Sequence, residues 1–296
     1  MNFENIIGNE ENKILLNSII KNNNISHSYL FYGIEGIGKA LFAKEFAKMI
    51  LCTDNKNGSC GQCKSCLQFD NDNNPDYYEI RLEENSIKID TIREMQKKVL
   101  EKPIISNKKV YIINDSDYMT KEAQNCLLKT LEEPPKYLTI ILIASNESKL
   151  LNTIKSRCIK IPFKSIESDI LKKYIYNNLG IQEIPSSILK ACLGSIGKAI
   201  KILDKKEIYQ NMDEIFVNIE RYTLLDIINS SGQLLKDKDE IYNLLDYINI
   251  IFFEKAKQNY KYVDYIKCIE ETKNNLKNNC NYDMCIDNLL YNIWTK

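Results

Sequence analysis

Short apolar runs alternate with amphipathic segments along the first 165 residues of the chain. The apolar runs predict β-strands at 29–32, 76–82, 108–115, 138–145 and 156–163. Between these runs, apolar residues recur at helical spacing after Lys39 and in the segments 89–102 and 120–135, which predicts helices. Strands that alternate with helices favour a parallel, doubly wound α/β sheet, with functional sites at the carboxyl ends of its strands.

The β pattern ends after Pro162, and the remainder of the chain has the pattern of helices. Residues 165–205 contain short helical segments interrupted by Gly and Pro. From about residue 208 the helical pattern continues, with an apolar stripe that we interpret as bundle core at Ile241, Leu244, Leu245, Ile248, Ile251 and Phe252. We therefore expect three domains, at 1–164, 165–207 and 208–296.

The segment GIEGIGKA separates an apolar strand from a helix, which is the setting of a phosphate-binding loop. Gly33, Gly38 and Lys39 match the spacing G-x-x-x-x-G-K-[ST], and Gly36 adds a further flexible position. Such a loop directs the backbone N–H groups of a helix N-terminus at a phosphate. However, Ala40 replaces the Ser or Thr whose hydroxyl would bind Mg²⁺.

A second element of a nucleotide site is expected at the carboxyl end of the strand 108–115. ATP-hydrolysing proteins of this layout place an Asp there as a ligand of Mg²⁺, followed by a Glu that polarises the attacking water. This chain has Asn114 and Asp115 instead. A neutral Asn is a poorer ligand of Mg²⁺ than a carboxylate, and Asp115 is one methylene too short to place the water. Together with Ala40, these residues predict a site without hydrolysis, while inert packing and weak phosphate binding both stay open for the loop.

Four of the ten cysteines fall in one short segment, CTDNKNGSCGQCKSC. They are Cys52, Cys60, Cys63 and Cys66. Four closely spaced thiolates with glycines between them are typical of closed, structural zinc sites, which predicts a zinc module at about 52–66. Buried free thiols and a redox cluster are the alternatives, and the clustering favours zinc. Cys280 and Cys285 lack two further partners nearby and are expected to pack between helices.

Composition narrows the function classes. The chain has 40 Lys and Arg against 40 Asp and Glu, whereas proteins that bind DNA phosphates on their own are usually basic, which disfavours a zinc-bearing nucleic-acid module. No apolar run reaches the length of a membrane span and the N-terminus lacks an apolar signal core, so a cytoplasmic location is expected.

His27 is the only histidine, which argues against Ser–His or Cys–His hydrolase chemistry. Glu132 and Glu133 are adjacent on a helix and diverge, so they are not expected to act as an acid–base pair.

Several motifs occur together and in order: HSYLFYGIEGIGKALFAKEFAKMI, the four-cysteine insert, NPDYYEI, VYIINDSDYMTKEAQNCLLKTLEEPP and TIKSRCIKIPF. In this combination, residues 1–165 resemble the delta-prime family of subunits of the bacterial DNA polymerase III clamp loader, within the AAA+ superfamily. LEEPP, SRC and the cysteines carry the resemblance, whereas the C-terminal helices add no weight to it.

The resemblance implies a RecA-like AAA+ core, a small helical lid, and a helical collar that joins motor and delta subunits in a hetero-pentameric ring. Such a ring uses ATP to place a sliding clamp on primed DNA. The delta-prime member is described as a stator that does not hydrolyse ATP, which agrees with Ala40 and Asn114. By the same resemblance, Arg157 of the SRC element reaches the ATP of a neighbouring motor subunit as an arginine finger. Asn146 and Lys198 occupy positions that contact nucleotide in active relatives.

The competing hypothesis is a catalytically active AAA+ ATPase, such as the motor subunit of the same loader. It requires Ser or Thr at position 40 and a carboxylate at position 114, and neither is present. The sequence therefore favours an accessory subunit of a DNA polymerase holoenzyme over an enzyme that acts on its own.

Overall fold

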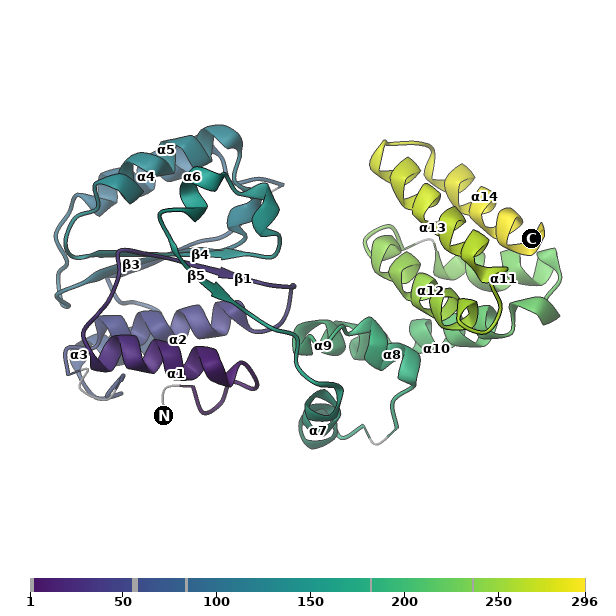
Figure 1. The fold of residues 1–296 in the computed structure, drawn as a ribbon, viewed down its shortest axis with the longest axis horizontal. Coiled ribbons are helices and arrows are strands. Elements are labelled where there is room, and N and C mark those ends of the chain that lie inside the picture. The colour runs from purple at the N-terminus through teal and green to yellow at the C-terminus, as the bar shows by residue number, and fades with distance from the viewer. Residues whose placement is uncertain (1–2, 55–57, 83–84, 182, 236, 296) are drawn as a thin grey trace. The chain divides into compact units, whose positions relative to one another are not determined.

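The computed structural model describes residues 3–54, 58–82, 85–181, 183–235 and 237–295 (Figure 1). The chain divides into two compact units, Met1–Ile166 and Glu167–Lys296. The first unit contains the sheet and the second is built of helices. The finer division into three domains stays a prediction.

A five-stranded sheet forms the centre of the first unit. Its strands are β1 (Ser28–Tyr32), β2 (Tyr77–Ile80), β3 (Lys109–Ile113), β4 (Leu138–Ala144) and β5 (Ile159–Pro162). They lie in the order β2-β3-β4-β1-β5, and every pair is parallel. All seven residues of β4 are buried, as expected of a central strand that is covered on both faces. Each predicted strand is present, with ends that differ by a few residues.

Helices cover both faces of this sheet (Figure 1). They are α1 (Glu10–Lys21), α2 (Lys39–Leu51), α4 (Ile89–Val99), α5 (Lys121–Glu132) and α6 (Asn152–Lys155). Successive strand residues point to opposite faces, so Phe31 packs with α1 and α2 while Leu30 packs with α4, α5 and α6. The expected α/β class, with a parallel sheet and a cysteine-rich insert followed by helices, is confirmed.

The sequence pattern did not indicate two helices of this unit, α1 and α3 (Lys64–Asp70). In α1 the apolar Ile14 is 71% exposed, while the polar Asn12 is buried and its Nδ2 donates a hydrogen bond to the Pro162 carbonyl at 2.8 Å. Because a polar residue is buried and an apolar residue is exposed, the apolar spacing in the sequence does not predict this helix.

The second unit is a helical array around its own core. Its helices are α7 (Ser168–Leu179), α8 (Ser186–Ala191), α9 (Ile196–Asp204), α10 (Lys206–Val217), α11 (Leu224–Leu234), α12 (Ile241–Ala256), α13 (Tyr262–Lys277) and α14 (Tyr282–Thr295). The apolar stripe predicted as bundle core lies on α12 and is buried throughout. Among the described residues, no helix combines the length and the apolar character needed to cross a bilayer.

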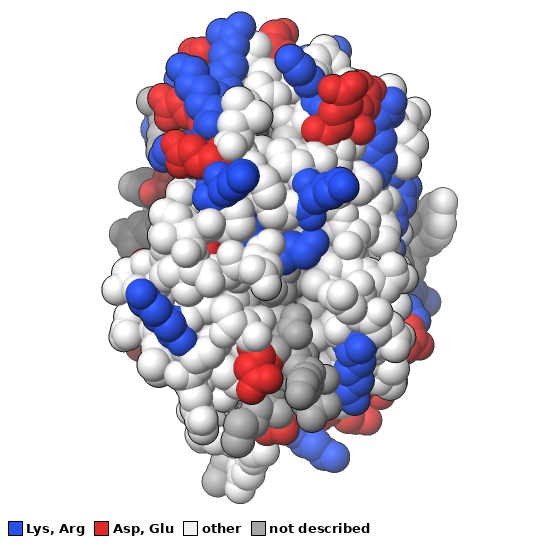
Figure 2. Space-filling view, turned by 90° about the vertical axis from the view of Figure 1, so that its left-hand side faces the viewer, with Lys and Arg blue, Asp and Glu red and all other residues white. Residues whose placement is uncertain are grey.

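One face of the molecule is drawn by charge in Figure 2. Lys and Arg side chains are interspersed there with Asp and Glu and with broad uncharged areas. The described side chains of this face therefore carry mixed charge. A protein that binds nucleic acid on its own typically has a basic patch or stripe.

Candidate functional site

The loop between β1 and α2 has the backbone of a phosphate-binding loop. Gly33, Gly36 and Gly38 have positive φ angles of 150°, 75° and 94°. A Cβ atom at Gly33 would lie 2.5 Å from the carbonyl oxygen of Phe163, so the chain after β5 leaves no room for a side chain there. Gly38 is the left-handed N-cap of α2, a conformation that favours glycine. The turn therefore places the amide end of α2 at the carboxyl edge of the sheet.

Lys39 is the first residue of α2, and its side chain folds back onto its own loop. Its Nζ donates to the carbonyl oxygens of Gly33 at 2.6 Å and Ile34 at 2.7 Å, and to Ser145 Oγ at 3.3 Å. Lys39 is only 5% exposed, and burial lowers the pKa of its ammonium group to about 8. The carboxylates that act in the opposite direction on this pKa belong to Asp117, Glu35 and Asp115.

The burial of Lys39 can be measured through the pH dependence of stability. The folded-state pKa of about 8 lies below the ordinary 10.5, so between these values the unfolded chain binds more protons than the folded chain. The contribution of Lys39 to the free energy of unfolding is therefore lowest below this window and rises as the pH increases through it. Lys39→Met removes the titration. We expect urea unfolding to show that the stability of wild type minus that of Lys39→Met increases from about pH 7.5 to about pH 10. A constant difference would contradict this assignment.

Asn114 and Asp115 directly follow β3, at the carboxyl edge of the sheet. Asp115 is half-buried and has a left-handed backbone, with φ at 49°. Burial raises the pKa of the Asp115 carboxyl, and the nearby charges of Asp117 and Glu35 raise this pKa further. Position 114 thus offers an amide in place of a carboxylate, and carboxylates gather beside the loop lysine.

Asp117 is a residue of this edge that the motif analysis missed. It is 5% exposed and accepts hydrogen bonds from the backbone N–H groups of Ser145 at 3.2 Å and Asn146 at 3.0 Å. Both donors directly follow β4, so Asp117 fixes the turn that ends β4 beside the loop. In the sequence, Asp117 is recognisable only as an acidic residue shortly after a strand. Asp115 has the same feature, so the sequence does not show which of the two binds the turn.

The sequence also singled out Ala40, which lacks the hydroxyl of the loop motif, and two positions that contact nucleotide in active relatives, Asn146 and Lys198. Ala40 is exposed in the first turn of α2. The Asn146 Oδ1 accepts hydrogen bonds from the N–H of Ser148 at 3.0 Å and its Oγ at 2.6 Å. Lys198 lies in α9 of the second unit, where its N–H donates to Ser195 Oγ at 3.1 Å. The expectation that Asn146 and Lys198 persist here as vestiges of a nucleotide site or as packing polar groups stays a prediction.

The four clustered cysteines come together between α2 and α3. The Sγ atoms of Cys52, Cys60, Cys63 and Cys66 all lie within 4.8 Å of one another. Cys52 is the C-cap of α2 and Cys63 is the N-cap of α3, and their sulfurs are 4.0 Å apart. Four sulfurs bound to one zinc ion at about 2.3 Å would be about 3.8 Å from each other. The cluster therefore fits a closed tetrahedral site and could hold a metal ion such as zinc.

Backbone N–H groups point at several of these sulfurs. The N–H groups of Cys60, Cys63 and Cys66 lie 3.3–3.4 Å from the Sγ atoms of Cys52, Cys60 and Cys63, respectively. Burial raises the pKa of the Cys63 thiol, but hydrogen bonds from Thr53 and from the Cys66 N–H outweigh it and lower this pKa to about 6. Burial raises the pKa of Cys66. Donors aimed at sulfur favour the thiolate, which is the form that binds metal.

Buried polar side chains attach the cysteine module to the sheet. Asn74 Nδ2 donates to the carbonyl and the hydroxyl oxygens of Ser65 in α3, each at 2.9 Å. The carboxylate of the fully buried Asp76 accepts from the N–H groups of Ile104, Ile105 and Ser106 at 2.6–2.8 Å. Ser106 Oγ in turn donates to the Leu51 carbonyl at the end of α2. Hydrogen bonds from the NPDYYEI motif therefore hold the cysteine module against the sheet.

The two C-terminal cysteines differ from each other. Cys285 is buried in α14, as expected for a packing residue. Cys280 is exposed, because it lies in the turn between α13 and α14, so the packing prediction is wrong for this residue.

Arg157 lies at the amino edge of the sheet, between α6 and β5. Its Nη1 donates to the Thr153 carbonyl at 2.9 Å, and its Nη2 forms an ion pair with Glu132 Oε1 at 2.7 Å. The side chain is 34% exposed. The Arg157 carbonyl accepts a hydrogen bond from Ser28 Oγ at 2.6 Å, which fixes the backbone beside the start of β1. The phosphate-type loop follows the opposite end of β1, a strand of five residues spanning roughly 16 Å.

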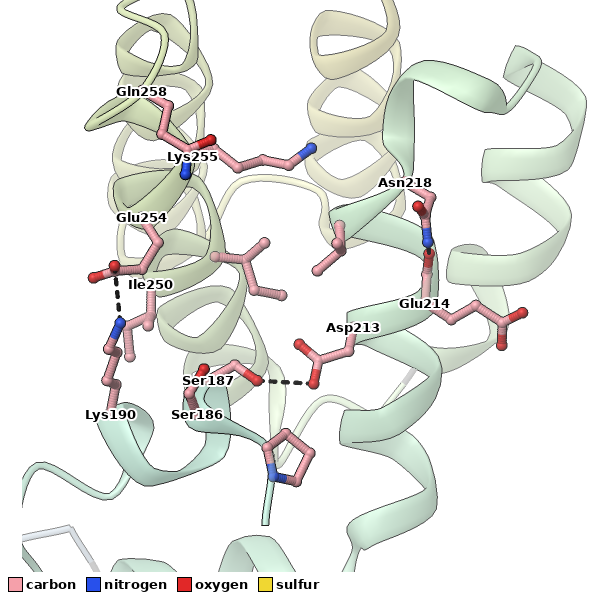
Figure 3. A pocket seen from close by; sticks show the side chains of 13 residues that line it. Ser186, Ser187, Lys190, Asp213, Glu214, Asn218, Ile250, Glu254, Lys255 and Gln258 are labelled. Carbon is pink, nitrogen blue, oxygen red and sulfur yellow. Dashed lines mark hydrogen bonds and ion pairs between the residues drawn. The ribbon is translucent and has the colours of Figure 1, made fainter. Parts of the chain in front are cut away.

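The helical unit also contains a cavity of about 680 Å³ between α8, α10 and α12 (Figure 3). Tyr247 OH donates to Ser187 Oγ at 3.0 Å, and Ser187 Oγ donates to Asp213 Oδ2 at 2.8 Å. An ion pair at 2.8 Å joins Lys190 and Glu254 on another wall. Sequence reasoning did not indicate this cavity, because its walls come from helices that are distant along the chain.

Comparison with known proteins identifies the family. The model of the family described as "DNA polymerase III, delta subunit" matches residues 8–167, which is more than half of the chain. The chain is 39% identical over 155 residues to the DNA polymerase III subunit delta' of Bacillus subtilis, covering 52% of this chain and 47% of that protein. It is 31% identical over 210 residues to the DNA polymerase III subunit tau/gamma of Haemophilus influenzae, covering 69% of this chain and 30% of that protein.

A crystal structure of a DNA polymerase III gamma subunit-related protein from Thermotoga maritima is also similar, with a TM-score of 0.48 and 18% identity, covering 95% of this chain and 98% of that one. The chain spans less than half of the length of the two curated relatives above. The family match and the delta' relatives confirm the resemblance that the motifs indicated: the chain belongs to the DNA polymerase III delta subunit family.

Proposed function

We propose that this chain is a non-hydrolysing subunit of a DNA polymerase III clamp loader, where it helps to place the sliding clamp on primed DNA. The observation that carries the proposal is the nucleotide-type loop, which keeps its backbone but has no metal anchors. Ala40 offers no hydroxyl and Asn114 no carboxylate, and the Lys39 ammonium is held by carbonyl oxygens of its own loop.

Electrostatics support the same conclusion. A bound nucleoside triphosphate is accompanied by Mg²⁺, which offsets its negative charge. This ion prefers carboxylate and hydroxyl oxygens in an octahedral arrangement. The side chains at the two usual ligand positions, Ala40 in α2 and Asn114 after β3, cannot supply those oxygens. The carboxylates of Glu35, Asp115 and Asp117 act on Lys39, so the local charge is unfavourable for a phosphate without a metal ion. The residues present therefore do not fit a hydrolysable magnesium nucleotide.

Arg157 is proposed to act on the ATP of a neighbouring motor subunit. It lies at the amino edge of the sheet, whereas the loop of the same chain is at the carboxyl edge. Its guanidinium therefore cannot reach a nucleotide in its own loop. It lies at the surface, where a nucleotide bound to another chain could contact it. The partners in this proposal are motor and delta subunits in a hetero-pentameric ring, and through them the clamp and DNA, in the cytoplasm.

The cysteine cluster is proposed to hold a structural zinc ion. Four sulfur ligands leave no coordination position for a reacting molecule, so the ion would stabilise the module that joins α2 and α3 and would supply no catalysis. Cys52, Cys60, Cys63 and Cys66 are the ligands, and the N–H groups aimed at their sulfurs favour the deprotonated form.

Steady-state ATPase and nucleotide-binding measurements on the purified chain test the proposal. We expect no ATP hydrolysis above background and no magnesium-dependent increase in the fluorescence anisotropy of a labelled ATP, because both metal anchors are missing. Lys39→Ala is the matched variant. Hydrolysis by the chain alone that disappears in Lys39→Ala would instead favour the alternative, an active AAA+ ATPase with an unusual metal site.

A further inference from the structure

Glu132 occupies a position that is electrostatically unfavourable for a carboxylate. It is the last residue of α5, where the carbonyl ends of the helix carry partial negative charge. Its side chain is half-exposed, so burial does not fix its identity. A carboxylate that breaks a local rule calls for a compensating contact elsewhere. The described structure gives it one such contact, the ion pair with Arg157 at 2.7 Å.

The guanidinium of Arg157 is held between the ends of two helices. Glu132 at the end of α5 contacts Nη2, and the Thr153 carbonyl in α6 accepts from Nη1. Arg has five N–H donors in a rigid planar fork, so these contacts leave donors over for an anion. With 34% of the side chain exposed, the guanidinium is fixed in orientation and still reachable from outside.

We propose that Glu132 is a positioning residue for Arg157, holding its guanidinium in a fixed, surface-facing orientation from which it engages the nucleotide phosphate of a neighbouring subunit. The inference rests on the proposed function of Arg157. Its physical basis is entropy: a free arginine side chain samples many rotamers, and the ion pair removes that freedom before the transition state is reached.

The ion pair is better suited to orientation than to stability. Exposed pairs of this kind contribute little to folding, because water screens them and both side chains lose freedom. For the same reason the Glu132 charge weakens the attraction of Arg157 for a phosphate only slightly. Orientation therefore outweighs charge competition, and removing Glu132 is expected to slow the partner's reaction.

The test is the ATPase of a complex of this chain with its cognate motor subunit. We expect Glu132→Ala to lower kcat about two- to fivefold while KM for ATP stays unchanged, because a finger acts in the transition state and an exposed pair can supply no larger orienting effect. Glu132→Gln keeps an oxygen that can accept from Nη2 and should retain most of the rate. Glu133→Ala removes the adjacent exposed carboxylate, which does not pair with Arg157 in the described part of the chain, and should behave as wild type.

The double variant Glu132→Ala/Arg157→Ala separates positioning from other effects. If Glu132 acts through Arg157, Glu132→Ala causes no further loss in the Arg157→Ala background. A full loss in Arg157→Ala together with an unchanged or raised kcat in Glu132→Ala overturns the inference alone. A wild-type rate in Arg157→Ala overturns both the inference and the proposed role of Arg157. Circular dichroism and the melting temperature of each variant confirm that the fold is intact.

Discussion

Arg157→Ala is expected to lower ATP turnover at the neighbouring motor site by about a thousandfold, because an arginine finger offsets the charge that develops on the transferred phosphate. The folded chain itself should change little. The ion pair with Glu132 is part-exposed, at 34% and 50% for the two side chains, and pairs of this kind contribute about 0–1 kcal/mol. The measurement is the rate of single-turnover ATP hydrolysis by a complex of this chain with its motor partner. Gel filtration shows whether the variant still forms that complex.

Two control variants sharpen this prediction. Arg157→Lys keeps the positive charge but loses the planar fork, so we expect most of the rate to be lost as well. Arg93→Ala removes another exposed arginine, which pairs with Asp90 at 3.1 Å on α4, and should leave the rate unchanged. An Arg157→Ala complex that assembles normally and turns over ATP at the wild-type rate contradicts the role of Arg157 in trans.

Loss of the metal from the cysteine cluster is expected to lower the free energy of unfolding of the first unit by about 4 kcal/mol, in the range reached when a structural metal is removed. Cys66→Ser should have this effect, because Cys66 is buried in the first turn of α3 and its sulfur is part of the cluster. The measurements are zinc content, with about one ion per chain expected, and urea unfolding before and after chelation.

Cys126→Ser is the matched control for this substitution. Cys126 is a half-buried thiol on α5 that donates to Gln96 Oε1 and lies outside the cluster. It should keep the full zinc content and respond to chelator as the wild type does. Acid should release the ion, since binding requires thiolates. A wild-type chain that contains no zinc after growth with the metal, or whose unfolding is insensitive to chelator, rules out the zinc proposal.

Much of the core could be predicted from the sequence, because the interactions concerned are local. Buried strands such as β4 are continuous apolar runs, and the positive φ angles at Gly33 and Gly38 favour glycine through the local backbone. Helix α1 escaped prediction because the contact of its buried Asn12 with Pro162 is tertiary. For Asn146 and Lys198, which match nucleotide-contacting positions of active relatives, the structure shows only local hydrogen bonds.

The sequence by itself determined which chemistry is available to this protein: a phosphate-type loop without a hydroxyl or carboxylate for magnesium, four cysteines at metal-ligand spacing, and an SRC arginine. The tertiary structure decided how these groups are used. It turned Lys39 onto its own loop, brought Asp117 to the end of β4, and paired Arg157 with Glu132. Chain spacing fixes only contacts within a turn or a few residues. The partner of Arg157 lies 25 positions away, so its identity depends on how α5 and α6 pack on the sheet.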